Sequence, residues 1–143
     1  MLKITPRTQK VLIYLSFHSN YSRHAINKGL DKIGEIVTKE ATKGIKSPPK
    51  TGNTYIYKGR VHRASASGQY PAHKTGKLVR GINKNRITRK LIIGSKAPYS
   101  TFLEKGTKKM RKRPFLIRAM MDTSSEQLRA LIDELNRRIK WKY

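Results

Sequence analysis

The side chains that could carry out catalysis are few in this sequence, and they lack the spacing that catalysis requires. Metal-ligand spacing and a neighbouring aspartate are absent around the four histidines, His18, His24, His62 and His73. The chain has no cysteine, which excludes disulfides, thiolate metal sites and cysteine nucleophiles. It also has no nucleophile elbow and no glycine-rich phosphate-binding loop. We therefore expect no catalytic site, no metal and no cofactor, and predict that the protein is not an enzyme.

The eight carboxylates are equally poor candidates for a paired acid and base. Seven of them, Asp122 included, lie on two predicted long helices, where solvated contacts with lysine or arginine four residues away are the expected role. Glu104 is the only acidic residue between positions 41 and 121. A carboxylate near a helix C-terminus is unfavourable with the helix dipole, so we expect Glu104 to form an ion pair with Arg113.

Positive charge is the dominant chemical feature of the chain. Its 33 lysines and arginines against 8 acidic residues give a net charge of +25 at pH 7. Such a chain repels itself unless a polyanion or an acidic partner screens it, which argues against a neutral metabolic enzyme. Tyr55, Tyr57 and Tyr70 lie among the cations of the middle segment, a combination typical of surfaces that follow phosphates and stack on bases. The candidate residues for subunit or DNA contact are Lys50, Arg60, Arg63, Lys74, Lys77 and Arg80.

Two long helices are the clearest elements that could position these residues. Apolar residues at steps of three and four predict the first helix, which starts at Asn20 or Ser22 and ends before Pro48-Pro49: Ile26, Leu30, Ile33, Val37, Ala41 and Ile45. The second helix is expected to start at Pro114. Polar residues at 122–126 interrupt its apolar pattern, which indicates a kink or break there.

Shorter elements fill the space between the helices. Strands are predicted at 54–57 and 60–64, joined by a turn at Lys58-Gly59, and near 82–86 and 89–94. Short helices are predicted at 76–80, capped by Thr75, and from Ala97 to Glu104. The run Val11–Leu15 fits a strand or a helix, and we favour a short helix that follows Thr5-Pro6.

These elements predict a single α+β domain over residues 1–143, with a small antiparallel sheet packed with two long helices. A chain of this length can bury about two-thirds of its unfolded surface without staples. The segment 47–77 is rich in Gly, Ser, Pro and Lys and is expected to be an extended basic arm or hairpin that projects from the domain. The longest apolar run, Val11–Leu15, is too short to span a bilayer, and no secretory signal precedes it, so we expect no membrane partner.

Two stretches carry a more specific pattern, HRASASGQYPAHKTGKL at 62–78 and APYSTFLEKGTKKMRKRPFLIRA at 97–119. They contain, in order, Pro-Ala-x-x-Thr-Gly-x-Leu, then a Tyr, Glu-x-Gly-Thr, and a basic residue before Pro-Phe-Leu. Over roughly residues 20–140 this pattern resembles the small tail-component (neck or tail-completion) family of long-tailed bacteriophages. The matching residues are Pro71, Ala72, Thr75, Gly76, Leu78, Tyr99, Glu104, Gly106, Thr107, Arg113, Pro114, Phe115 and Leu116.

The resemblance implies a structural virion protein of the neck or tail junction, made in the host cytoplasm, that helps to join or complete head and tail. It would assemble as a homo-oligomeric ring around the DNA conduit, with other neck, head-completion and tail proteins as partners. We expect the arm to reach a neighbouring subunit or an adjoining ring and its cations to meet acidic protein surfaces, with non-specific contact to genomic DNA as a second expectation. One alternative is a basic nucleic-acid-binding protein that contacts phosphates without reading sequence. Another is a small nuclease that uses His62 or His73.

Overall fold

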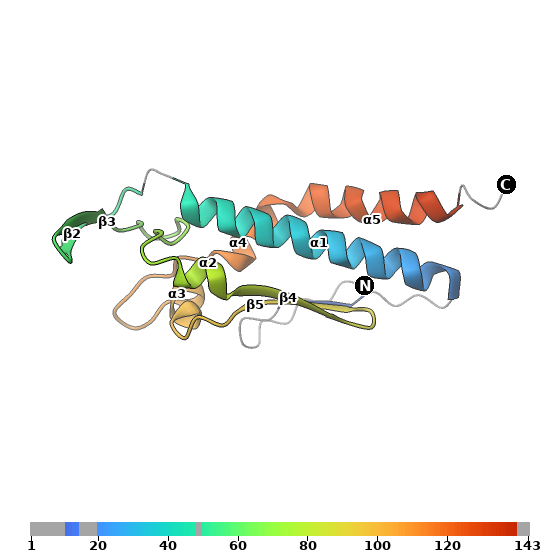
Figure 1. Ribbon diagram of the computed structural model, residues 1–143, viewed down its shortest axis with the longest axis horizontal. Coiled ribbons are helices and arrows are strands. Elements are labelled where there is room, and N and C mark those ends of the chain that lie inside the picture. The colour runs from blue at the N-terminus through green and yellow to red at the C-terminus, as the bar shows by residue number, and fades with distance from the viewer. Residues whose placement is uncertain (1–10, 15–19, 48–49, 140–143) are drawn as a thin grey trace.

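The computed structural model describes residues 11–14, 20–47 and 50–139 of the chain. The described residues confirm the predicted α+β class: two long helices, α1 (Asn20–Lys46) and α5 (Ser124–Ile139), pack together beside a small antiparallel sheet. Figure 1 shows three layers, with α1 between the sheet and α5. Because α1 also contacts the shorter helix α4 (Leu116–Asp122), the core forms on more than one side of α1.

The apolar stripe of α1 accounts for this central position. All six predicted positions of the stripe are buried: Ile26, Leu30, Ile33, Val37, Ala41 and Ile45. Burying one such Ile or Leu side chain stabilises the fold by about 1.5–3 kcal/mol relative to leaving it exposed. Gly29 of α1 allows α5 to approach closely, since a Cβ at this position would lie 2.6 Å from Cδ1 of Leu131 on α5.

The sheet has three antiparallel strands in the order β1–β5–β4: β1 (Val11–Tyr14), β5 (Lys90–Ser95) and β4 (Ile82–Ile87). Strands β4 and β5, both predicted near these bounds, pair as a hairpin, with Ile87 opposite Lys90 and Thr88 in the turn at a φ of 53°. The central strand buries Leu91 and Ile93 in the core that α1 shares.

The segment Val11–Tyr14 is a strand, so the short helix predicted there is wrong. It pairs with β5, with Val11 opposite Ile93 and Tyr14 opposite Lys90. A short apolar run carries too little periodicity to choose its own structure. The open edge of β5 favours the strand, because pairing with it satisfies backbone N–H and C=O groups on both strands. The predicted helix start at Thr5-Pro6 lies outside the described residues.

Strand β4 forms the other edge of the sheet and carries two cations that reach α1. Lys84 Nζ lies 2.9 Å from Glu35 Oε1, and Arg86 Nε lies 2.8 Å from Asp31 Oδ1. Both pairs are partly exposed, so each contributes about 1 kcal/mol or less to stability. Their geometry nevertheless fixes the edge strand to the helix that covers the sheet.

The last helical region consists of two helices, which confirms the predicted break. Helix α4 ends at Asp122 and α5 begins at Ser124, with Thr123 between them at a φ of −107° and a ψ of 13°. At the break the Thr123 hydroxyl donates to the Ala119 carbonyl and the Gln127 side-chain amide donates to the Met120 carbonyl, both at 2.7 Å, so side chains satisfy backbone acceptors there. The first helix of the region starts at Leu116 and not at Pro114.

Two short helices and a second hairpin complete the described structure. The short helices are those predicted, α2 (Lys77–Gly81) and α3 (Ser100–Lys105). Within the predicted arm, β2 (Thr54–Tyr57) and β3 (Arg60–Arg63) form a separate two-stranded sheet. No helix in the described ranges is long and apolar enough to cross a membrane.

Candidate functional site

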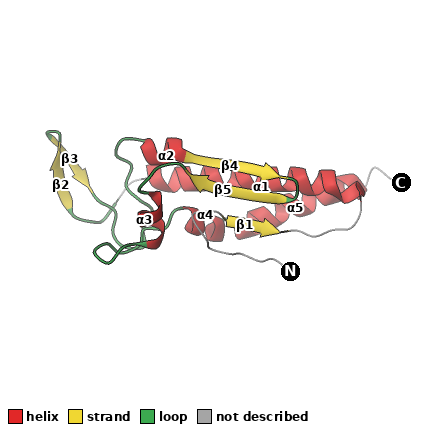
Figure 2. Ribbon diagram, turned by 90° about the horizontal axis from the view of Figure 1, so that it is seen from below, coloured by secondary structure: helices red, strands yellow, loops and turns green. Residues whose placement is uncertain are grey.

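The β2–β3 hairpin projects beyond the end of α1, as Figure 2 shows. Every residue of β2 is exposed, and so is every residue of β3 except His62. Ile56 and Val61 lie opposite each other in the hairpin and are 76% and 72% exposed. A two-stranded hairpin is marginally stable by itself in water. An apolar pair this exposed adds almost no burial to its own chain and is open to a neighbour.

The other face of the hairpin contacts the body of the protein through Lys74. Its Nζ lies 3.2 Å from the ring centroid of Tyr57 and 5.0 Å from that of Tyr55. His62 stacks on Tyr55, with the ring centroids 6.0 Å apart. An exposed cation–π contact contributes about 0.5–1 kcal/mol. The chain's own side chains thus contact both rings, although Tyr55 and Tyr57 each remain 40% exposed.

The base of the hairpin is a close crossing of two backbone segments. The Gly52 N–H donates to the Ala64 carbonyl, and the Ala64 N–H donates to the Asn53 carbonyl, both at 2.9 Å. A Cβ on Gly52 would lie 2.7 Å from the Ala64 oxygen, so this approach requires glycine. Beyond the crossing the chain rejoins the body, where Ser65 and Pro71 are buried. The projecting arm is therefore the hairpin alone and is shorter than the predicted 47–77.

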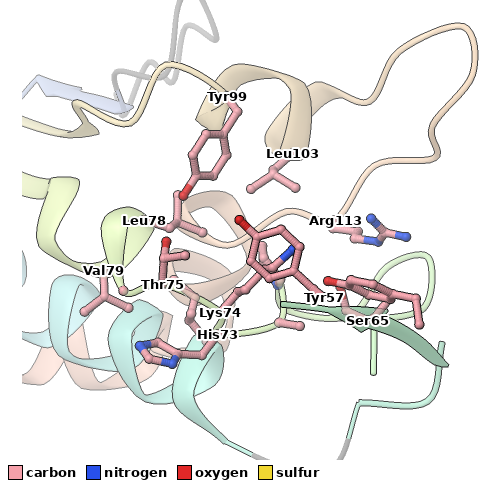
Figure 3. Close-up of a pocket in the computed structure, with 16 residues that line it drawn as sticks. Tyr57, Ser65, His73, Lys74, Thr75, Leu78, Val79, Tyr99, Leu103 and Arg113 are labelled. Carbon is pink, nitrogen blue, oxygen red and sulfur yellow. The ribbon is translucent and has the colours of Figure 1, made fainter. Parts of the chain in front are cut away.

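A cavity of about 350 Å³ lies where the hairpin base meets the body. In the close-up of Figure 3, Tyr57 and Lys74 lie on one side, with Tyr99 and Leu103 from the α3 region and Leu78 from α2 around them. No carboxylate lines the cavity, and its polar groups are hydroxyls, phenols, His73, Lys74 and Arg113. This wall provides no pair of carboxylates for acid–base catalysis.

The cavity is also the place where the two specific stretches of the sequence meet. Its lining includes, from the first stretch, Pro71, Ala72, Thr75, Gly76 and Leu78, and from the second, Tyr99 and Arg113. The fold therefore brings together residues that the sequence presents only as an ordered pattern.

Glu104 caps α4 and does not pair with Arg113, so the predicted ion pair is wrong. The carboxylate is buried and accepts three backbone N–H groups, at Oε2 from Phe115 (2.8 Å) and Leu116 (3.4 Å) and at Oε1 from Ile117 (2.8 Å). The first N–H groups of a helix have no partner within the helix, and a negative charge is favourable there. This contact joins the end of α3 to the start of α4.

The residues just before α4 are held in the same region. The Arg113 N–H donates to the Leu103 carbonyl at 2.7 Å, and an Arg113 guanidinium N–H donates to the sulfur of Met110 at 3.7 Å. Pro114 follows, and Phe115 is fully buried in the core. The motif residues here have architectural roles.

Gly76, and not Thr75, occupies the N-cap position of α2. Gly76 has a φ of 73°, and no side chain caps the helix, so the predicted capping role of Thr75 is wrong. The left-handed turn at Gly76 leaves the preceding residue outside the cap, where Thr75 is exposed. Gly106 ends α3 with a φ of 77°, which confirms the predicted tight reversal. Thr107 Oγ1 then accepts the N–H of Met110 at 3.0 Å.

Lys50, one of the candidate contact residues, binds the body of its own chain. Its Nζ donates to the Gly44 carbonyl at 2.7 Å, near the C-terminus of α1. Burial, and after it the nearby charge of Arg118, lower the pKa of Lys50 from its ordinary value. This lysine stabilises a helix end, where a positive charge is favourable.

The other candidate cations divide into two groups. Arg63 and Arg80 donate to backbone carbonyls of their own chain, to Gly52 at 3.3 Å and to Thr75 at 3.0 Å. Within the described residues, the candidates with no hydrogen bond or ion pair of their own are Arg60, Lys74 and Lys77.

Tyr70 is a structural residue whose role the sequence analysis missed. Its ring lies against Gly44, where a Cβ would be 2.6 Å from three ring carbons. The phenol donates to Asp122 Oδ2 at 3.0 Å, and the guanidinium of Arg118 lies 4.9 Å from the ring centroid. Burial, followed by the bond to Asp122, raises the pKa of Tyr70 well above its ordinary value, so the phenol remains a donor. The available signal was Gly44 within a helical pattern.

No known protein family, curated protein or solved structure matches the chain. Among the described residues no group of three or more histidines and acidic residues could hold a metal ion. The exposed hairpin, the cavity at its base and the distribution of charge are the features of the described residues that bear on function.

Proposed function

We propose that this chain is a structural virion protein of the bacteriophage neck or tail junction, which assembles as a ring and helps to join or complete head and tail around the DNA conduit. The observation that carries the proposal is the projecting β2–β3 hairpin, whose apolar pair Ile56 and Val61 gains burial only from a neighbour. The family-like residues that line the cavity at its base support the same assignment.

The chemistry of the described residues also favours an architectural role. Glu104, the one carboxylate of the middle segment, is fully used in capping α4. Lys50, Arg63 and Arg80 are engaged with backbone carbonyls. A net charge of +25 still requires screening by partners, and an assembly around DNA supplies both acidic protein surfaces and phosphates.

The proposal is tested by removing the coding sequence of the chain from the genome that carries it and imaging the particles produced. We expect separate heads and tails to accumulate, and wild-type protein supplied in trans to restore joined particles. Subunit-resolution imaging of the restored particles should show the chain as a ring at the junction. Normal joined particles without the chain, or particles that lack it when it is present in the cell, would refute the proposal.

A second candidate function, sequence-independent binding to nucleic acid, is favoured by the loop after α3. Its cations are exposed: Lys108, Lys109, Arg111 and Lys112. None of them has an ion-pair partner in the described residues. Phosphate contacts by such a loop would release counterions and depend steeply on salt.

We expect the replacement of Lys108, Lys109, Arg111 and Lys112 by glutamine to lower the magnitude of the slope of log K against log salt by about 3.6 for duplex DNA, since each phosphate contact contributes about 0.9. The measurement is fluorescence anisotropy over a salt series. A matched control replaces four exposed cations of α1 by glutamine, Arg23, Lys28, Lys39 and Lys46. Equal slopes for both variants would mean that net charge alone, and not this loop, determines binding.

A further inference from the structure

The cavity at the base of the hairpin is lined by polar side chains that have no hydrogen-bond partner among the described residues. Ser65 is 3% exposed, and its hydroxyl forms no hydrogen bond there. Nε of Arg113 is buried and likewise has no acceptor, while another guanidinium N–H has only the sulfur of Met110, a weak acceptor, at 3.7 Å. Because buried polar groups are nearly always hydrogen-bonded, unpartnered donors in a cavity wall indicate a ligand that carries acceptor groups.

The charge around this cavity is positive. Lys74 and Arg113 line it, and among the described residues no carboxylate does. Nζ of Lys74 forms no hydrogen bond or ion pair with the described residues and lies over the ring of Tyr57, 3.2 Å from the centroid (Figure 3). A ring face attracts an ammonium group through its quadrupole alone, so the three N–H donors of Lys74 keep capacity for an acceptor. The acceptor that suits these two cations is an anion.

Apolar side chains form much of the remaining wall. Ile45, at the end of α1, and Leu78, in α2, are 1% and 6% exposed. The other aliphatic lining residues are Pro71, Ala72, Val79 and Leu103. Sites for small ligands are mostly apolar with a few oriented polar groups, and they measure about 300–1,000 Å³. A cavity of about 350 Å³ with this wall therefore suits an anionic group that is carried on a short apolar stem.

An acidic peptide supplies both parts of such a ligand. Glutamate and aspartate carry a carboxylate on an apolar stem, and arginine and lysine bind carboxylates through strong charge-assisted hydrogen bonds. The phosphates of a nucleic acid are joined directly to sugars and bring no aliphatic group that matches Ile45, Leu78 or Leu103. The net charge of +25 attracts acidic protein segments over a longer range and favours the same class of ligand.

We infer that this cavity binds an acidic side chain from a peptide segment of another protein. Lys74 and Arg113 supply the positive charge for the carboxylate, the Ser65 hydroxyl donates to the peptide, and the aliphatic wall buries the stem of the acidic side chain. The inference goes beyond the proposed function, because purified protein should bind such a peptide whether or not the chain belongs to a particle.

The affinity of purified full-length protein for a defined probe tests the inference. The probe is a fluorescein-labelled hexapeptide of alternating leucine and glutamate, followed by anisotropy. Lys74→Gln should weaken binding by about tenfold, the loss expected for a charge-assisted hydrogen bond. Ser65→Ala, which leaves the net charge unchanged, should weaken it several-fold. The matched control Lys96→Gln removes an exposed lysine outside the cavity wall and should change the affinity by about twofold or less. Equal losses in Lys74→Gln and Lys96→Gln, or no loss in Ser65→Ala, would overturn the inference.

Three further ligands separate the acidic peptide from its alternatives: the same peptide with glutamine in place of glutamate, single-stranded oligothymidylate, and inorganic phosphate. We expect only the acidic peptide to shift the backbone amide NMR signals of residues 64–65, 72–76 and 113 at micromolar concentration. Equal shifts with the glutamine peptide would show an apolar groove, and equal shifts with oligothymidylate or phosphate would show a phosphate site. Shifts by the acidic peptide confined to residues 106–112 would place it on the basic loop. Each of these three results would overturn the inference.

Failure of this inference and failure of the proposed function are distinguishable. A chain that binds the acidic peptide at the cavity but is absent from particles would refute the neck role and retain the peptide site. A chain that forms a ring in particles while its cavity binds no acidic peptide would retain the neck role and refute the site.

Discussion

Replacing Glu104 by glutamine should lower the free energy of unfolding by about 2–4 kcal/mol. The carboxylate uses both oxygens to accept the first N–H groups of α4, at 2.8 Å from Phe115 and 2.8 Å from Ile117. In glutamine one oxygen becomes an NH2 group, which would face a backbone donor. A buried N–H then loses its acceptor, and the stabilising charge at the start of α4 disappears. Chemical denaturation followed by circular dichroism measures the change.

The matched control is Glu35→Gln, which raises the net charge by the same amount. Glu35 is largely exposed and pairs with Lys84 across the surface, so its loss should cost about 1 kcal/mol or less. If both variants lose the same stability, the effect of Glu104→Gln comes from net charge, and the capping role assigned to Glu104 is wrong.

Replacing Gly44 by valine should destabilise the fold by about 2–3 kcal/mol, because it overpacks the contact between α1 and Tyr70. A Cβ at this position would lie 2.6 Å from the ring carbons Cγ, Cδ1 and Cε1. The ring cannot move freely, since its hydroxyl is bonded to Asp122 at 3.0 Å and Arg118 lies over its face. Thermal and denaturant unfolding of the purified variant measure the loss.

Two further variants separate the clash from a general effect on the helix. Lys39→Val places the same β-branched residue at an exposed position of α1 and should cost much less. Adding Tyr70→Ala to Gly44→Val should remove most of the penalty of the valine, because the atoms it meets are gone. Additive losses in the double variant would show that Tyr70 is not what limits position 44.

The parts of the fold that the sequence predicted correctly are those whose own pattern determines their structure. The stripe from Ile26 to Ile45 repeats over several helical turns, and every position of it is buried. The β2–β3 hairpin carries its own predicted turn, and the strands β4 and β5 were predicted close to their bounds. In these elements local periodicity and tertiary packing favour the same structure.

The predictions that proved wrong concern segments whose structure depends on contacts with residues far away in the sequence. Val11–Tyr14 is a strand because β5, far along the chain, offers an open edge. Glu104 caps α4 because the loop after α3 returns to the end of that helix, and a sequence shows charge but not the backbone donors that a carboxylate will meet. The structural role of Tyr70 was missed for the same reason, since its partners Gly44 and Asp122 are remote in sequence.

The candidate site was predicted in part for the same reason. The motif residues were identified as an ordered set, but the convergence of seven of them on one cavity is a property of the fold. The candidate cations were selected by charge alone, and Lys50 proved to serve a helix end. The exposure of Ile56 and Val61 could not be inferred from a strand of alternating residues, because the pattern does not show that one face lacks a covering layer.

The ion pairs that fix β4 to α1 have a consequence for how crowded copies of this protein behave. An unprotected strand edge invites strand addition and can template fibrils. In β4, Lys84 and Arg86 turn toward Asp31 and Glu35 on the covering helix, so an incoming strand would have to approach an edge that carries tethered charge. This edge disfavours amyloid-like growth even at high local protein concentration.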